Sequence, residues 1–158
     1  MAKAGYSVVT GASVSLAAST AKSVLGVQAG DSFGLDLKKI AFGFFGTSAS
    51  EASVLCELCY ATFASNSPGT ASTAVTTSVQ QKYGRPITHG VTAARNWTTE
   101  PTALTVLDEW PLTPNAGTLL YDLPLGDTYD CDPEEGFVLR LTAAATVTVR
   151  ATMTWERC

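Results

Sequence analysis

Apolar and polar residues alternate strictly near the end of the chain. In VTVRATMTWE, residues 147–156, every odd position is apolar and every even position carries a hydroxyl or a charge. Five periods of this alternation predict a half-buried β-strand. Phe137, Leu139 and Leu141 repeat the pattern directly upstream, so a second strand is expected there, with the alanines at 143–145 forming the turn between the two.

Further strands are predicted along most of the chain. Pro124 cannot donate a ladder hydrogen bond, so the strand that contains it is expected at an edge or an end of a sheet. Turn signals rich in Gly, Pro, Asn and Asp separate the runs. About eight short strands separated in this way predict an all-β, single-domain sandwich or barrel. The additional predicted strands are 54–63, 75–83, 91–97, 103–110 and 119–125.

One segment changes its parity part-way along. From Phe33 to Leu37 the apolar residues occupy odd positions, and from Ile40 onward they occupy even ones. One extra residue at Lys38-Lys39 would return all of these side chains to the same face, which is what a β-bulge does. We therefore predict one long strand with a bulge at this point.

Two segments leave alternatives open. Residues 1–30 are rich in Ala, Ser, Gly and Thr, which suits either an N-terminal arm lying on a neighbouring subunit or one or two edge strands. The β-sandwich domain is then expected over residues 31–158. Residues 48–51, Ser-Ala-Ser-Glu, have the form of a helix capping box, so a short helical turn is an alternative before the strand at 54–63.

Composition and charge narrow the class of protein. Only 15% of the 158 residues are charged and 46% are hydrophobic, which is typical of a folded chain and not of a disordered one. Residues 1–99 carry seven Lys and Arg against four Asp and Glu, and residues 100–158 carry three against ten. This polarity suits a subunit or partner of complementary charge, or an ordinary solvated surface. No basic face with interleaved aromatics is evident, so no nucleic-acid partner is expected.

No membrane partner and no secretion are expected either. No apolar run approaches the roughly 18 residues of a membrane span. The apolar part of the N-terminal segment is broken repeatedly by Gly, Ser and Thr, so no signal peptide is predicted. A protein that stays in a reducing cytosol would not use a disulfide framework.

Cys56 and Cys59 share the spacing of zinc knuckles and of thiol redox sites. A zinc site needs two further ligands, and the remaining candidates, Cys131, Cys158 and His89, form no second pair at suitable spacing. An odd separation on a strand directs the two thiols to opposite faces. A thioredoxin-like motif also requires a βαβ context. We interpret both cysteines as packing residues, with metal binding and redox chemistry as less favoured alternatives.

A second stretch that could carry chemistry is acidic. An oxygen-rich loop of this kind could hold Ca²⁺, but the order of residues does not match the EF-hand loop. A solvated or subunit-facing acidic loop is therefore favoured. The carboxylates are Asp122, Asp127, Asp130, Asp132, Glu134 and Glu135, with no Lys or Arg among them.

Catalytic signatures are missing from the sequence. The single histidine, His89, follows Pro86 and precedes Gly90, so a surface loop is expected there. There is no nucleophile elbow, phosphate-binding loop or dinucleotide fingerprint. An enzyme is thus the least favoured class, and no catalytic, cofactor-binding or metal-binding residues are expected.

Four short motifs resemble small structural proteins encoded by tailed phages of actinobacteria. Together they extend over roughly residues 35–158 and contain no catalytic residues. The motifs are Phe-x-Gly at 44–46, Val-Leu-x-Glu-Leu at 54–58, Thr-x-Glu-Pro-Thr at 98–102 and Thr-x-x-Trp-Glu at 152–156.

This resemblance implies a jelly-roll-like sandwich and a role in the virion. Capsid decoration (cement) proteins often have such folds and trimerise. The expected function is that of a homotrimer, made in the host cytoplasm, which binds the major capsid protein on the outer capsid surface and stabilises the shell. Several weak contacts from one oligomer would combine into strong binding.

Two other functions are kept as alternatives. One is a tail or head–tail structural protein of the virion. The other is a carbohydrate-binding β-sandwich with an exposed tryptophan, although Trp155 is expected in the core and Trp110 at a sheet rim.

Overall fold

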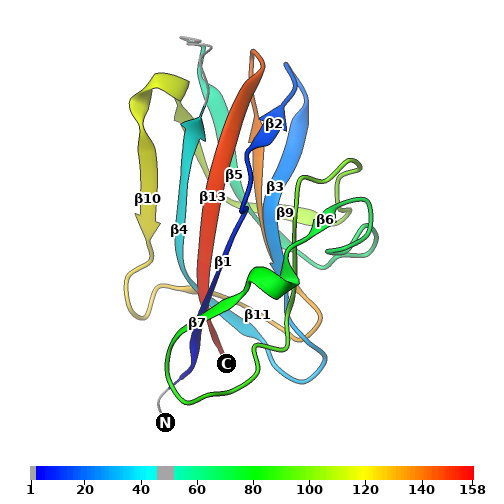
Figure 1. Ribbon diagram of the computed structural model, residues 1–158, viewed down its shortest axis with the longest axis vertical. Coiled ribbons are helices and arrows are strands. Elements are labelled where there is room, and N and C mark those ends of the chain that lie inside the picture. Colours follow the sequence, from blue (N-terminus) through cyan, green and yellow to red (C-terminus); the bar gives the residue numbers. More distant parts are fainter. Residues whose placement is uncertain (1–2, 46–51) are drawn as a thin grey trace.

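The computed structural model describes residues 3–45 and 52–158, and the turn and capping box expected at 46–51 lie outside these residues. The described residues form strands in two layers and two single-turn 3₁₀ helices (Figure 1). The elements are β1 Gly5–Val9, β2 Val14–Leu16, β3 Ala21–Gln28, β4 Leu35–Phe45, β5 Val54–Ala61, β6 Thr73–Ala74, η1 Thr76–Ser78, β7 Gln80–Tyr83, β8 Thr92–Arg95, β9 Leu104–Leu112, η2 Pro114–Ala116, β10 Thr118–Asp122, β11 Tyr129–Cys131, β12 Gly136–Thr142 and β13 Val147–Arg157.

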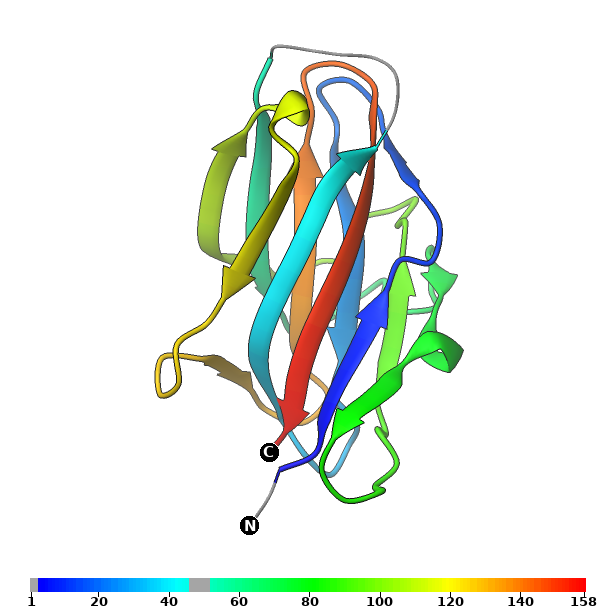
Figure 2. The same ribbon diagram turned by 60° about the vertical axis from the view of Figure 1, so that its left-hand side comes forward.

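Two antiparallel sheets pack face to face (Figure 2). The seven-stranded sheet has the order β10-β4-β13-β1-β7, with β11 also beside β4 and β2 also beside β13. The six-stranded sheet has the order β6-β8-β3-β12-β5-β9. Strand β10 lies at an edge and ends at Asp122, before Pro124, as the proline predicts. Among the described residues, no helix has the length and apolarity that crossing a membrane requires.

The strand pairing is that of a jelly roll. Strands β1 and β2 follow one another along β13, and β10 and β11 follow one another along β4, so eight long segments form the framework. The first segment pairs with the last, β3 with β12, β4 with β10–β11, and β5 with β9. A long hairpin rolled into two sheets has this nested pairing. The predicted all-β sandwich is confirmed, but the described residues contain thirteen strands where about eight were predicted, because two framework segments are divided and the short β6–β8 are added.

The bulge in β4 lies where the parity change predicts it. Thr154 of β13 lies opposite Lys39, whereas the next residue, Trp155, lies opposite Leu37, so Lys38 is the extra residue. Leu37 and Ile40 on either side are both fully buried. The bulge thus keeps one apolar face along the whole strand.

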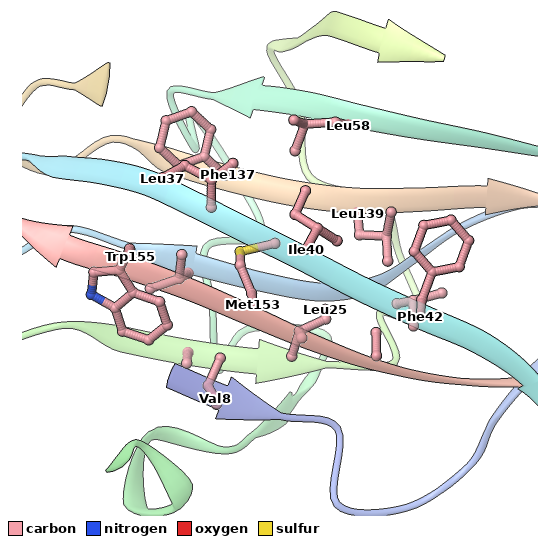
Figure 3. Packing of buried hydrophobic residues seen from close by; sticks show 14 of the residues in the cluster. Val8, Leu25, Leu37, Ile40, Phe42, Leu58, Phe137, Leu139, Met153 and Trp155 are labelled. Carbon is pink, nitrogen blue, oxygen red and sulfur yellow. The ribbon is translucent and has the colours of Figure 1, made fainter. Parts of the chain in front are cut away.

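The core between the sheets consists of alternating residues from both layers (Figure 3). Ile40 and Met153 of the seven-stranded sheet and Leu58 and Leu139 of the six-stranded sheet are fully buried. Complete burial of such a side chain stabilises the folded state by about 1.5–3 kcal/mol. The predicted strands 137–141 and 147–156 are confirmed, and residues 143–146 connect them.

The predicted strand at 75–83 is interrupted. Val75 and Val79 are buried, but residues 76–78 form the 3₁₀ turn η1, and only Gln80–Tyr83 pairs with β1. The Thr76 hydroxyl accepts a hydrogen bond from the backbone N–H of Ala93 and donates one to its carbonyl oxygen. This side chain takes the place of a backbone ladder partner, so the chain turns without leaving N–H or C=O groups unpaired.

The first 30 residues meet the two expectations only in part. They form no arm, because β1 lies between β13 and β7 and β3 lies between β8 and β12; only the short β2, which pairs with β13 alone, is an edge segment. Tyr6, Val8 and Leu25 are buried in the core. Residues 1–30 thus contribute interior strands to both sheets, and the sandwich is not confined to residues 31–158.

The long connection 62–103 covers part of the outer face of the six-stranded sheet. Trp97 is buried there, packs near Gly26 and Val138, and donates a hydrogen bond from Nε1 to the carbonyl oxygen of Asn66 at 2.8 Å. A Cβ atom on Gly26 would lie 3.0 Å from Trp97 and from Val138, so glycine lets the indole pack here without a shift of these side chains. This second cluster consists of Cys59, Ala61, Phe63, Ala94, Trp97 and Val138, with Leu104 against it.

Candidate functional site

The outer face of the seven-stranded sheet carries the clearest surface feature of the described residues. A row of side chains crosses four neighbouring strands through Val9 of β1, Thr152 of β13, Ala41 of β4 and Leu120 of β10. Val9 is 42% exposed and Leu120 is 59% exposed. Outward positions of a sandwich strand are normally polar, whereas three of the four side chains in this row are apolar, and we call this row the apolar strip.

Small residues on β4 make this face hollow. Ala41 and Gly43 occupy outward positions between residues with larger side chains, such as Phe45 and Arg150. A groove of about 600 Å³ lies over them. A Cβ atom on Gly43 would lie 2.9 Å from Thr118 Oγ1, so glycine lets β10 lie close to β4. The residues of β1, β4, β10 and β13 that line the groove thus form what we call the sheet groove: Val9, Thr10, Gly11, Ala41–Phe45, Thr118 and Arg150–Thr152.

Phe45 and Arg150 form one end of the sheet groove. Phe45 is 62% exposed, and the Arg150 guanidinium carbon lies 5.4 Å from the centre of its ring. A cation over an aromatic ring is attracted by the ring electrons. Arg150 also donates a hydrogen bond from Nε to Ser13 Oγ at 3.2 Å. The end of the groove therefore combines a large apolar surface with one positive charge, a combination suited to contact with another macromolecule.

Sequence reasoning did not single out these residues, although a signal for them exists. Each exposed member follows a buried or half-buried apolar residue, in Val8-Val9, Phe44-Phe45 and Leu119-Leu120. Two adjacent apolar residues break the alternation of a half-buried strand, and the second then points to solvent. Such doublets indicate that a strand is apolar on both faces.

The cysteines of the Cys-x-x-Cys motif lie on opposite faces of β5, as predicted. Cys56 belongs to the core between the sheets, and Cys59 belongs to the cluster beneath residues 62–103. Burial raises the pKa of the Cys56 thiol to about 12 and that of Cys59 to about 11. Cys131 is buried and Cys158 exposed, and all four thiols are free. The described residues contain no group of three or more His, Cys, Asp or Glu side chains that could hold a metal ion.

The side chains of the acidic stretch and His89 make separate contacts in different parts of the structure. Glu135 accepts hydrogen bonds from the Tyr60 hydroxyl and from the backbone N–H of Asp132, whereas Asp122 faces solvent near Lys39. His89 lies in the β7–β8 loop, where Nδ1 accepts a hydrogen bond from the backbone N–H of Val91 at 3.2 Å. The carboxylates thus contribute to separate local contacts.

None of the three tryptophans is exposed, contrary to what a sugar-binding site of that type would need. Trp97 and Trp155 are buried, and Trp110 is half-buried in the edge strand β9 with its ring centre 4.9 Å from that of Tyr121. The expectations of a core Trp155 and a rim position for Trp110 are both met.

Charge is not separated in space as it is in sequence. The nested pairing places N-terminal and C-terminal strands side by side, and ion pairs join the two halves of the chain. Lys38 lies 3.4 Å from Glu156, and Arg140 Nε lies 2.8 Å from Glu57. The excess of basic residues before position 100 therefore does not create a basic half of the molecule.

Comparison of the chain with protein-family models, with curated proteins and with solved structures finds no match. What the protein does must therefore be inferred from its own strands and surfaces.

Proposed function

We propose that this protein is a capsid decoration (cement) protein of a tailed phage, without catalytic activity, which binds the major capsid protein as a homotrimer on the outer capsid surface. The observation that carries the proposal is the apolar strip, of which Val9, Ala41 and Thr152 line the sheet groove. Monomeric proteins rarely expose contiguous apolar patches that have no binding role. The resemblance of the four sequence motifs to phage structural proteins and the jelly-roll sandwich support the same interpretation.

In this proposal the sheet groove makes the contact with the shell. Its floor of backbone and small side chains can receive an apolar side chain of the partner. Phe45, which lines the groove, and Leu120, which lies beside Ala41 on β10, provide exposed apolar surface. Contacts of this kind need not be strong individually. Three copies in one trimer, each binding a neighbouring capsid subunit, raise the overall affinity by about 10²–10⁴-fold over one contact when the geometry allows simultaneous binding.

The test is co-sedimentation with purified capsids from which the protein is absent. The double variant Phe45→Ser, Leu120→Ser should weaken capsid binding at least tenfold. The matched control is Leu125→Ser, because Leu125 is 95% exposed but lies in the loop after β10, outside the groove. Equal binding by the wild type and the double variant would refute the groove as the contact face. Failure of the wild type to bind any capsid would refute the decoration function.

A tail or head–tail position is the second proposal, and copy number distinguishes it from decoration. Quantitative mass spectrometry of purified virions should find the protein at hundreds of copies per particle if it decorates the capsid. A few to tens of copies would favour the tail or connector.

A further inference from the structure

At the end of the sandwich where β13 finishes, a second hollow has a different chemical character from the sheet groove. Its volume is about 380 Å³, and its walls include Lys3, Arg85 and Arg157 together with the apolar side chains of Phe33 and Ile87. The β7–β8 loop that carries Arg85 and Ile87 lies at the same end as the C-terminal residue (Figures 1 and 2). Ala4 and the exposed Cys158 complete the lining, which contains no Asp or Glu side chain.

Arg157 is half-buried and yet has no carboxylate partner. Its guanidinium carbon lies 3.8 Å from the centre of the Phe33 ring, and its Nη1 donates a hydrogen bond to the carbonyl oxygen of Thr88 at 3.0 Å. No ion pair joins Arg157 or Arg85 to a carboxylate within residues 3–45 and 52–158. A half-buried charge is normally paired, so this guanidinium has unused capacity for an anion.

The third cation of the hollow is already paired. Lys3 Nζ lies 2.9 Å from Asp36 and 3.8 Å from Glu156, and both carboxylates also pair with Lys38. Lys3 thus balances the negative charges behind it, and the unbalanced positive charge of the hollow comes from the two arginines.

The loop that carries Arg85 is held in place. Gln81 Nε2 donates a hydrogen bond to the carbonyl oxygen of Arg85 at 2.6 Å, and the Tyr6 hydroxyl donates one to that of Ile87. Gly84 has a φ of +95°, and a Cβ atom there would lie 2.6 Å from the Lys3 carbonyl oxygen, so glycine allows the loop to pack against the first strand. The backbone of the loop and the Arg157 guanidinium are therefore held in place, whereas the Arg85 side chain is exposed. A partly preformed hollow reduces the entropy lost on binding.

We propose that this hollow binds an oxyanion, either a carboxylate or a phosphate group, carried on a molecule with an apolar portion. The planar fork of a guanidinium matches both anions and binds them through paired hydrogen bonds. Ile87 is 37% exposed and offers the apolar contact. The inference is independent of the capsid proposal. This hollow would bind an anion at the end of the sandwich, whereas the sheet groove would receive an apolar side chain of the capsid protein.

The test is a titration of ¹⁵N-labelled protein with sodium phosphate and, separately, with sodium acetate, at an ionic strength held constant with sodium chloride. We expect saturable shifts of the Arg157 Nε–H signal and of the amides of Arg85 and Ile87. Saturation with phosphate alone assigns a phosphate-bearing ligand, saturation with acetate alone assigns a carboxylate, and saturation with both supports the shared chemistry. The absence of saturable shifts with either anion would overturn the proposal.

Variants separate a specific site from general attraction of anions. Arg85→Gln and Arg157→Gln should each weaken binding about tenfold, the loss of one charge-assisted pair of hydrogen bonds. Arg150→Gln is the matched control, since it removes a positive charge from the sheet groove, away from this hollow. Equal weakening by all three variants would overturn the proposal. If Arg157→Gln does not fold, Arg85→Gln on the exposed loop decides the question alone, read against the same control.

Discussion

Asp36 is a carboxylate whose side chain is only 9% exposed, beside two lysine ammonium groups. Burial alone would raise its pKa, but hydrogen bonds from Lys38, Thr128 and Lys3 outweigh burial and lower the pKa below its usual 3.8. A pKa that is lower in the folded state than in the unfolded state stabilises the fold above the unfolded value, and this stabilisation is lost as the pH falls through the folded value. Asp36 therefore links stability to pH in the acid range.

Replacing Asp36 by Asn should lower the free energy of unfolding by about 1–2 kcal/mol at pH 7, since two lysines lose their carboxylate partner. As the pH falls below the usual pKa of 3.8 and then through the lower pKa of the folded state, the wild-type carboxylate is increasingly protonated, so the difference between wild type and variant should shrink. Urea denaturation at a series of pH values measures this. A difference that stays constant from pH 7 to pH 2 would contradict the role assigned to the carboxylate.

The reactivity of the individual thiols tests the interpretation that Cys56 and Cys59 of the Cys-x-x-Cys motif are packing residues. Because the thiolate is the reactive form and burial raises the pKa of Cys56 and Cys131 to about 12, neither should react in the folded protein at pH 8. Cys59, with a pKa raised to about 11, should be equally inert. A chromogenic disulfide reagent should therefore titrate only Cys158, and all four thiols after unfolding. Rapid reaction of Cys56 and Cys59 would instead support the alternative interpretation of the motif as a redox site.

At the scale of the element, strand β1 has one face buried in the core and one face exposed to solvent. Val8 is 1% exposed and packs in the core, whereas its neighbour Val9 is 42% exposed at the sheet groove. The strand also forms ladders with both β13 and β7. It is thus a structural part of the sheet and not a detachable arm.

Val8→Ala should lower the free energy of unfolding by about 2 kcal/mol, because a buried methyl pair is lost from a packed core. Val9→Ala, one residue along, should change it by less than about 0.5 kcal/mol, as is usual for surface positions. Removal of residues 1–9 should abolish the cooperative thermal transition altogether. Retention of a cooperative transition by that truncated chain would show that β1 is dispensable and restore the arm interpretation.

At the scale of the whole molecule, one open side of the sandwich is closed by a hydrogen-bonded seam. Asp108 of β9 accepts hydrogen bonds from the hydroxyls of Tyr121 at 3.1 Å and Tyr129 at 2.7 Å, on β10 and β11 of the other sheet. Trp110 packs on Tyr121 beside them. The seam joins the edge of one sheet to the edge of the other, so it resists their separation.

Asp108→Ala should destabilise the protein by about 2 kcal/mol, the usual effect of losing hydrogen bonds to a charged group. The hydrogen bond to Asp108 raises the pKa of Tyr129 to about 12, so the same variant should return that pKa toward its ordinary value near 10. Spectrophotometric titration of the tyrosines at 295 nm measures the change. Asp108→Asn is the control, because both hydroxyls donate to the same oxygen, Oδ2, and the amide oxygen of asparagine has two lone pairs that can accept both hydrogen bonds. An unchanged titration in Asp108→Ala would exclude the seam.

Features that depend on local periodicity followed from the sequence alone. The alternation in 147–156, the parity change at Lys38-Lys39 and the odd spacing of Cys56 and Cys59 each predict a local geometry, because successive side chains on a strand point to opposite faces. The structure has all three. The all-β class follows from the repetition of such segments between turn signals.

The tertiary structure decided what local periodicity cannot express. Strands β1 and β3 become interior strands only because β13 and β12, far along the chain, offer them partners, and the composition of residues 1–30 gives no local sign of it. The same nested pairing intermixes the basic and acidic halves, lets Trp97 pack against Gly26 and gathers Val9, Phe45 and Leu120 on one face. Side-chain alternation specifies which face a residue occupies, whereas the neighbour across that face depends on the fold of the whole chain.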